Sequence, residues 1–221
     1  MWWPGGRSSA NSAHSWVAPA VSLTLLAASS AMAATPDTYL ARKAEFVVEG
    51  GTVKGFEVAS RITYPFPVEE VLDATHDHVH LSERDRDVKL EEVMTTRCTR
   101  DLCRINVHVL VGSYFPVGKV AYELDTRVRR TPEGGVLIEW RKVSGSRLIK
   151  HLRGTLRLTP AGDEAADTEV DYRLEIAAPT LSLGKVTKKA EAYLQRLGAI
   201  LEGRHGGHAS LWSLMDQAAV P

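Results

Sequence analysis

Apolar and charged residues alternate along several consecutive stretches of this chain. In 120–124 and 172–176, for example, apolar side chains fall at every second position and charged residues fill most positions between them. Such alternation predicts β-strands with one dry and one wet face, and consecutive strands with short turns predict an antiparallel sheet. The pattern places seven strands, at about 55–64, 88–97, 104–111, 117–130, 136–143, 151–159 and 168–177.

The period changes after Pro179, where apolar residues recur at helical spacing up to Leu201. This spacing predicts a long amphipathic helix over 184–202, with Gly203 as its stop. Acidic residues after Pro67 indicate a short helix at 68–74, and a second short helix is expected in the polar stretch that follows. The predicted fold class is α+β: a curved antiparallel seven-stranded sheet around a long C-terminal helix, with two short helices after strand 1.

The first 33 residues have the features of a signal peptide. Arg7 is the only charge before Asp37, an apolar stretch covers 17–31, and Ala31-Met32-Ala33 fits the small-x-small cleavage pattern. A membrane anchor fits less well, because the apolar stretch is shorter than the roughly 20 residues of a span. We therefore expect export to the periplasm or secretion, with cleavage near Ala33. The remaining chain divides into a lead-in at 34–54, a domain at 55–202 and a tail at 203–221, with a short helix around 211–215.

Charge limits the classes of partner. The chain has 27 basic and 27 acidic residues, and the basic residues do not gather in one stretch. Nucleic-acid binding normally needs a basic stripe or patch, so this class is disfavoured. Binding to anionic headgroups would need a similar cluster. We expect a monomer without a nucleic-acid partner, and at most transient membrane contact.

Cys98 and Cys103 lie on two predicted strands joined by a four-residue turn. They would face each other across the hairpin mouth, at a separation that a disulfide can bridge. A redox-active or metal-binding pair would more usually have the spacing Cys-x-x-Cys. A structural disulfide is therefore predicted.

The dry face of the sheet and the facing side of the long helix form the candidate ligand-binding surface. Tyrosine and tryptophan on this surface can hold a polar atom of a ligand while packing against its carbon skeleton. The pattern alone also fits a fully packed core. The candidate ligand-binding residues are Val107, Val109, Val120, Tyr122, Leu124, Ile138, Trp140, Leu156, Tyr172, Leu174, Tyr193 and Leu197.

Few residues suggest catalysis or metal binding. His76, His78 and His80 have a spacing that suits metal ligands, with Asp73 or Glu83 as a further ligand, but a solvated junction explains the run better. No nucleophile elbow or phosphate-binding glycine loop is present. We predict no metal site, no cofactor and no catalytic residue, and an enzyme is the less favoured reading. The aromatic segment 111–118 fits equally a lid, a membrane-touching loop or a packed corner.

The order of elements resembles that of the START-like (SRPBCC) superfamily of polyketide cyclase/dehydrase-like and lipid-transfer proteins. The stretches that carry the resemblance are 62–71, 87–89, 154–160 and 168–175. The resemblance covers about 55–202 and implies a helix-grip fold with a deep apolar cavity between sheet and helix. It supplies no universal catalytic residues and does not name the ligand. An exported member would differ from the many cytosolic relatives.

The leading hypothesis is an exported carrier that binds a hydrophobic or amphipathic, lipid-like small molecule in this cavity. One alternative is a cyclase- or dehydratase-type enzyme on a polyketide-like or aromatic substrate, with Tyr122, Tyr172 or a histidine at the cavity mouth as proton donor. Another is an envelope interaction module that uses Leu211 and Trp212 of the tail as its contact.

Overall fold

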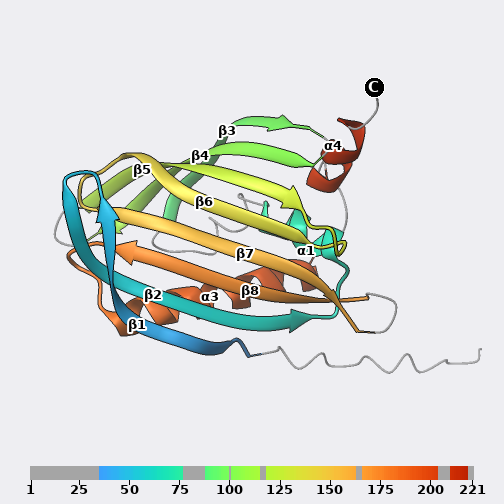
Figure 1. The fold of residues 1–221 in the computed structure, drawn as a ribbon, viewed down its shortest axis with the longest axis horizontal. Coiled ribbons are helices and arrows are strands. Elements are labelled where there is room, and N and C mark those ends of the chain that lie inside the picture. The colour runs from blue at the N-terminus through green and yellow to red at the C-terminus, as the bar shows by residue number, and fades with distance from the viewer. Residues whose placement is uncertain are drawn as a thin grey trace, which may run out of the picture. The chain divides into compact units, whose positions relative to one another are not determined.

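A single antiparallel sheet organises the chain in the computed structural model, which describes residues 35–76, 88–99, 101–114, 118–162, 166–203 and 210–218. The sheet has eight strands in the order β1-β2-β8-β7-β6-β5-β4-β3. In Figure 1, β2, β8 and β7 pass in front of the long helix α3, so α3 covers one face of the sheet. We call this covered face the inner face and the opposite face the outer face. Among the described residues, no helix is long and apolar enough to cross a membrane.

The strand bounds follow the predicted alternation closely. From β3 to β8 each strand pairs with the next one in sequence, and β8 also pairs with β2, which joins the two parts of the sheet. The strands are β1 (Asp37–Val48), β2 (Gly51–Tyr64), β3 (Val88–Cys98), β4 (Leu102–Tyr114), β5 (Gly118–Arg130), β6 (Val136–Gly145), β7 (His151–Ala161) and β8 (Asp167–Ala177).

The prediction of seven strands is wrong by one, because β1 lies inside the predicted lead-in. β1 pairs with β2 along nearly its whole length, through a tight turn at Gly50 and Gly51, whose φ values are 91° and 134°. It is an edge strand with a bulge between Thr38 and Leu40, and most of its residues are exposed or half-buried. Its alternation is therefore weak, and the sheet begins well before residue 55.

The helices agree with the sequence pattern where the structure describes them. α1 (Val68–Thr75) starts after Pro67, and α3 (Leu183–Gly203) covers the predicted 184–202. Because β1 precedes β2, α1 follows the second strand rather than the first. The second short helix predicted after α1 falls at residues that lie outside the described part of the chain.

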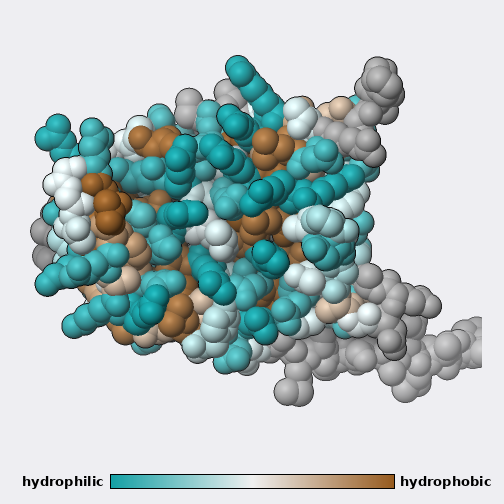
Figure 2. Space-filling view, in the orientation of Figure 1, coloured by the Kyte–Doolittle hydropathy of each residue, from teal (hydrophilic) through white to brown (hydrophobic). Residues whose placement is uncertain are grey.

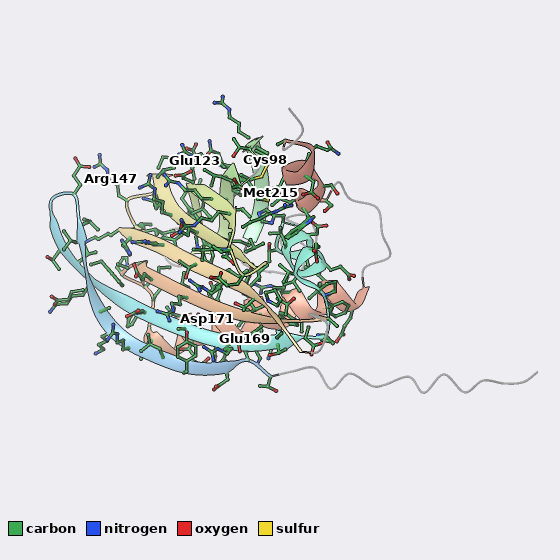
Figure 3. The ribbon with its side chains drawn as sticks, turned by 45° about the vertical axis from the view of Figure 1, so that its right-hand side comes forward. Cys98, Glu123, Arg147, Glu169, Asp171 and Met215 are labelled. Carbon is green, nitrogen blue, oxygen red and sulfur yellow. A yellow bond between two sulfur atoms is a disulfide. The ribbon has the colours of Figure 1, made fainter. Side chains whose placement is uncertain are left out.

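The tail also forms a helix, α4 (Leu211–Gln217), which packs against α1. Leu211 and Met215 are buried, and the backbone N–H of Leu211 donates a hydrogen bond of 2.9 Å to Asp73 Oδ1. The apolar side chains that an interaction module would offer to a partner are thus largely used within the chain. Met215 is labelled on α4 in Figure 3.

Buried polar contacts fix α3 against β1 and β2. The Tyr64 hydroxyl donates to the carbonyl oxygen of Leu194, and the Tyr64 ring lies against Gly198, where a Cβ would be 3.2 Å from Cε1. Thr38 Oγ1 donates to Glu191 on α3 and lies 2.8 Å from Ser60 Oγ. This side of the helix is therefore clamped to the sheet.

The predicted disulfide between Cys98 and Cys103 is present. The two residues are register partners at the end of the β3–β4 hairpin, and their Cα atoms are 4.1 Å apart. Cys103 is fully buried in the core. The bond therefore fastens the edge strand β3 to β4.

Candidate functional site

All of the predicted ligand-binding residues lie on the inner face of the sheet or on the facing side of α3. Their burial separates them into two groups. The fully buried group is Val107, Val109, Val120, Ile138, Leu156, Tyr172 and Leu197. The half-buried group, which packs against the core, is Tyr122, Leu124, Trp140, Leu174 and Tyr193. The predicted strand faces are therefore correct, and whether these residues bind a ligand remains a prediction.

Register pairs arrange the inner side chains in rows across the sheet. Rows 1 and 2 lie towards the β5–β6 turn, and apart from the half-buried Arg130, which pairs in register with Val136, their members are at most 6% exposed. Row 1 is Val136, Leu158, Val170 and Ile62. Row 2 is Val128, Ile138, Leu156, Tyr172 and Ser60. This end of the interior is a packed core.

Burial decreases towards the β6–β7 turn. Row 3 combines buried and half-buried positions: Thr126, Trp140, Gly154, Leu174 and Val58. Every member of row 4 is half-buried: Leu124, Lys142, Leu152, Ile176 and Phe56. A filled core would bury large apolar side chains on an inner face almost completely. The inner face is thus closed at row 1 and accessible at row 4.

Three aromatic rings connect the sheet to α3 between the packed and the accessible end. The ring centroids of Trp140 and Tyr172 are 5.7 Å apart, and those of Tyr172 and Tyr193 are 5.2 Å apart. Trp140 extends over Gly154 of β7, where a Cβ would lie 2.2 Å from Trp140 Cζ2. Glycine is therefore required at this mid-strand position, and the three rings form a floor below the open end.

Two charged side chains, Arg130 and Lys142, occupy inward positions in the described parts of β4 to β8. One of them has an acidic partner and the other has none among the described residues. Arg130, at the closed end, pairs with Asp216, and its guanidinium lies 4.1 Å above the Trp212 ring. Lys142, in row 4, forms no ion pair or hydrogen bond with any residue that the structure describes. Burial lowers the pKa of Lys142 because it disfavours the charged ammonium.

Tyr172, one of the residues considered for catalysis, has a raised pKa. Burial raises the pKa of the Tyr172 hydroxyl, and the positive charge of Arg196 only partly opposes this effect. A tyrosine with a raised pKa is a weaker acid near neutral pH, which does not favour it as a proton donor. Tyr122 is half-buried beside this region.

Metal ligation finds no support in the described part of the chain, where no group of three or more His, Cys, Asp or Glu residues could hold an ion. Asp73 accepts the hydrogen bond from Leu211, and His76 Nδ1 is 3.1 Å from the carbonyl oxygen of Leu72. His78, His80 and Glu83 of the predicted run lie outside the described residues.

The outer face is a network of paired charges. The Asp171 carboxylate forms ion pairs with Arg61 and Arg173 and accepts a hydrogen bond from the Tyr39 hydroxyl. Arg141 and Arg127 lie within ion-pair distance of Asp125. A surface hollow of about 690 Å³ lies among such side chains, and its charged residues are either paired with each other or exposed to solvent, as Arg153 and Arg157 are. Figure 2 shows this face as mostly hydrophilic, and Figure 3 labels Glu169 and Asp171 on β8. The inner face is the better candidate site.

Part of the open end was not predicted from the sequence. Phe56, Leu152 and Ile176 belong to row 4 but were not among the predicted ligand-binding residues. Their alternation with charged neighbours already places them on the inner face. The signal that singles out row 4, the partial exposure of its members, depends on where α3 lies and is absent from the pattern.

The eight-stranded antiparallel sheet and the long C-terminal helix define a START-like, helix-grip fold. Solved structures with this architecture include the STAR-related lipid transfer protein from Xanthomonas axonopodis, with 16% identity and a TM-score of 0.56. That match covers 73% of this chain and 98% of the other. No family model and no curated protein matches the sequence.

Two human structures show the same likeness. The lipid transfer and protein localization domain of StarD13 has 12% identity and a TM-score of 0.52, covering 75% of this chain and 91% of the other. STARD10 has 11% identity and a TM-score of 0.52, with coverages of 81% and 83%. At these identities the likeness defines the fold alone.

Proposed function

We propose that this protein is an exported carrier that binds a hydrophobic or amphipathic small molecule between row 4 of the sheet and α3. The observation that carries the proposal is the loss of burial from row 1 to row 4, which leaves large apolar side chains accessible at one end of the interior. The lipid-transfer proteins of similar fold support the same reading. Export rests on the signal-peptide pattern of residues 1–33.

The expected binding energy comes mainly from apolar burial. Each buried methylene gains about 0.8 kcal/mol, so eight methylenes would gain about 6 kcal/mol before the cost of association. The aromatic floor adds ring surfaces against which a chain or a ring system can pack. Useful affinity therefore requires no catalytic or metal centre.

The test begins with native mass spectrometry of the mature protein, purified after export and followed by organic extraction. We expect a bound species of defined mass that solvent releases. Binding of a neutral fluorescent probe, N-phenyl-1-naphthylamine, is then measured for wild type and two variants. Leu124→Trp adds volume in row 4, whereas Leu156→Trp adds it in row 2.

The two variants should behave differently. Leu124→Trp is expected to abolish probe binding and to change Tm by only a few degrees, because its side chain enters accessible space. Leu156→Trp overfills a packed core and is expected to destabilise the fold by about 1–3 kcal/mol. If Leu124→Trp is as destabilising as Leu156→Trp and the wild type binds neither probe nor ligand, the interior is filled and the carrier function is refuted.

A further inference from the structure

We infer that the ligand of this site is an amphipathic anion, such as a long-chain carboxylate, whose acidic head is held by Lys142 at the open end. The inference rests on the proposed function and specifies its ligand class. The chain of such a ligand would extend from Lys142 towards the floor of Trp140, Tyr172 and Tyr193. Its head would lie near the β6–β7 turn.

The surroundings of Lys142 distinguish it from the outer arginines. Its side chain is half-buried on the inner face, opposite Leu124 and two positions beyond Trp140. Outer-face arginines either lie within ion-pair distance of a carboxylate, as Arg61 does, or are exposed to water, whereas Lys142 is half-buried and has no ion pair among the described residues. Withdrawing a cation from water without a counter-charge is unfavourable, and an anionic ligand would remove this penalty.

The other inward cation of β4 to β8 supplies a contrast within the same sheet. Arg130 has the same inward orientation at the closed end, but Asp216 and the Trp212 ring neutralise or cover it. The chain thus provides a partner for the inward cation of its packed end. At the accessible end, the structure describes no acidic side chain on the inner faces of β4 to β8.

A second observation concerns the start of α3, which follows β8 just beyond row 4. The first seven residues of α3 contain three exposed lysines, Lys185, Lys188 and Lys189, and its first turn contains no acidic residue. The helix macrodipole disfavours a cation in the first turn, so Lys185 does not stabilise the helix by this effect. In a chain with equal numbers of acidic and basic residues, Lys185 and Lys188 place positive charge at the start of the helix that follows β8, where it would attract an anion.

The experiment compares dodecanoate with dodecan-1-ol, which has the same chain and no charge. Displacement of N-phenyl-1-naphthylamine from the full mature protein is measured for each competitor, at concentrations where the competitor does not aggregate. The variants are Lys142→Gln and Lys142→Glu. Arg141→Gln is the matched control, because it also removes one positive charge, from the neighbouring residue on the outer face.

We expect wild type to bind dodecanoate about tenfold more tightly than dodecan-1-ol. Lys142→Gln should remove this preference, and Lys142→Glu should reverse it. The affinity of each variant for dodecan-1-ol is measured in parallel, so that the effect of Lys142 is read as a change in the ratio of the two affinities, and Arg141→Gln should keep the preference. Replacing a half-buried cation by a neutral residue should leave Tm equal or higher, so misfolding is not expected to confuse the result.

The failures are distinguishable. If probe and dodecan-1-ol bind but Lys142→Gln leaves the affinity for dodecanoate unchanged, the anionic-head inference is overturned and the carrier function stands. The same holds if wild type shows no preference for dodecanoate. If neither the probe nor either competitor binds, the proposed function fails and the inference fails with it.

Discussion

Replacement of Gly154 by alanine tests whether the aromatic floor depends on the space that this glycine leaves. A Cβ at this position would lie 2.2 Å from Trp140 Cζ2, 2.4 Å from Trp140 Cε2 and 2.8 Å from the Arg173 carbonyl oxygen. These distances are far inside van der Waals contact. The indole ring must therefore leave its position over β7, and its packing against Tyr172 is lost.

The expected cost is about 1–3 kcal/mol, the usual range for overpacking a well-filled site. For a domain of this size, this corresponds to a decrease in Tm of about 2–12 °C. Gly184→Ala is the control, because nothing lies within 4 Å of the Cβ that it would add. Because Gly184 is exposed at the start of α3, its replacement should change the free energy of unfolding by about 0.5 kcal/mol or less.

A double-mutant cycle identifies the contact responsible. Urea unfolding is measured for wild type, Gly154→Ala, Trp140→Leu and the double variant. Because leucine does not reach over residue 154, the alanine should cost much less in the Trp140→Leu background, with a coupling energy above about 1 kcal/mol. A coupling energy near zero would refute the reasoning, since the cost would then come from the Arg173 backbone or elsewhere.

Three further predictions concern stability. Met215→Ala should lower the free energy of unfolding in urea by about 2–5 kcal/mol, because the Met215 side chain is fully buried. Leu214→Ala, at a 38% exposed position of the same helix, should lower it far less. Equal effects of the two substitutions would contradict the packing of α4. Burial raises the pKa of Tyr64 and of Tyr172, so the folded state keeps protons that the unfolded chain loses above about pH 10, and stability should fall there by about 1.4 kcal/mol per pH unit for each tyrosine. Tyr64→Phe should remove one such contribution from the pH dependence of urea unfolding, and an unchanged slope would show that Tyr64 ionises equally in both states. Replacing both Cys98 and Cys103 by alanine should cost about 2 kcal/mol in the same assay, as loop closure predicts for so short a ring, and a variant as stable as wild type would argue against a structural role of the disulfide.

The sequence predicts the central sheet well because the physical signal there is strong. Residues such as Tyr122 and Leu156 alternate with charges that must face water, and this fixes both the strands and their faces. The disulfide follows from hairpin geometry in the same way. In β1, by contrast, Arg42 and Lys43 are adjacent and both exposed, so period-two alternation is interrupted where the strand nonetheless pairs with β2.

The candidate site is predicted only as far as its face. Alternation places Leu174 and Leu156 on the same side of the sheet, yet one is half-buried and the other fully buried. This difference arises from the position of α3, which contacts such as that between Tyr64 and Leu194 determine. Contacts between residues far apart in sequence leave no local pattern, and for this reason the accessible end emerges only from the folded chain.

The exposed charges of β1 have a consequence for solubility. β1 is the terminal strand of the sheet, and a bare strand edge is a template on which a second molecule can add its own strand. A bulge between Thr38 and Leu40 distorts this edge, and Arg42, Lys43 and Glu45 would bring hydrated charges into any such contact. The residues that obscure β1 in the sequence therefore also disfavour edge-to-edge aggregation of the folded protein.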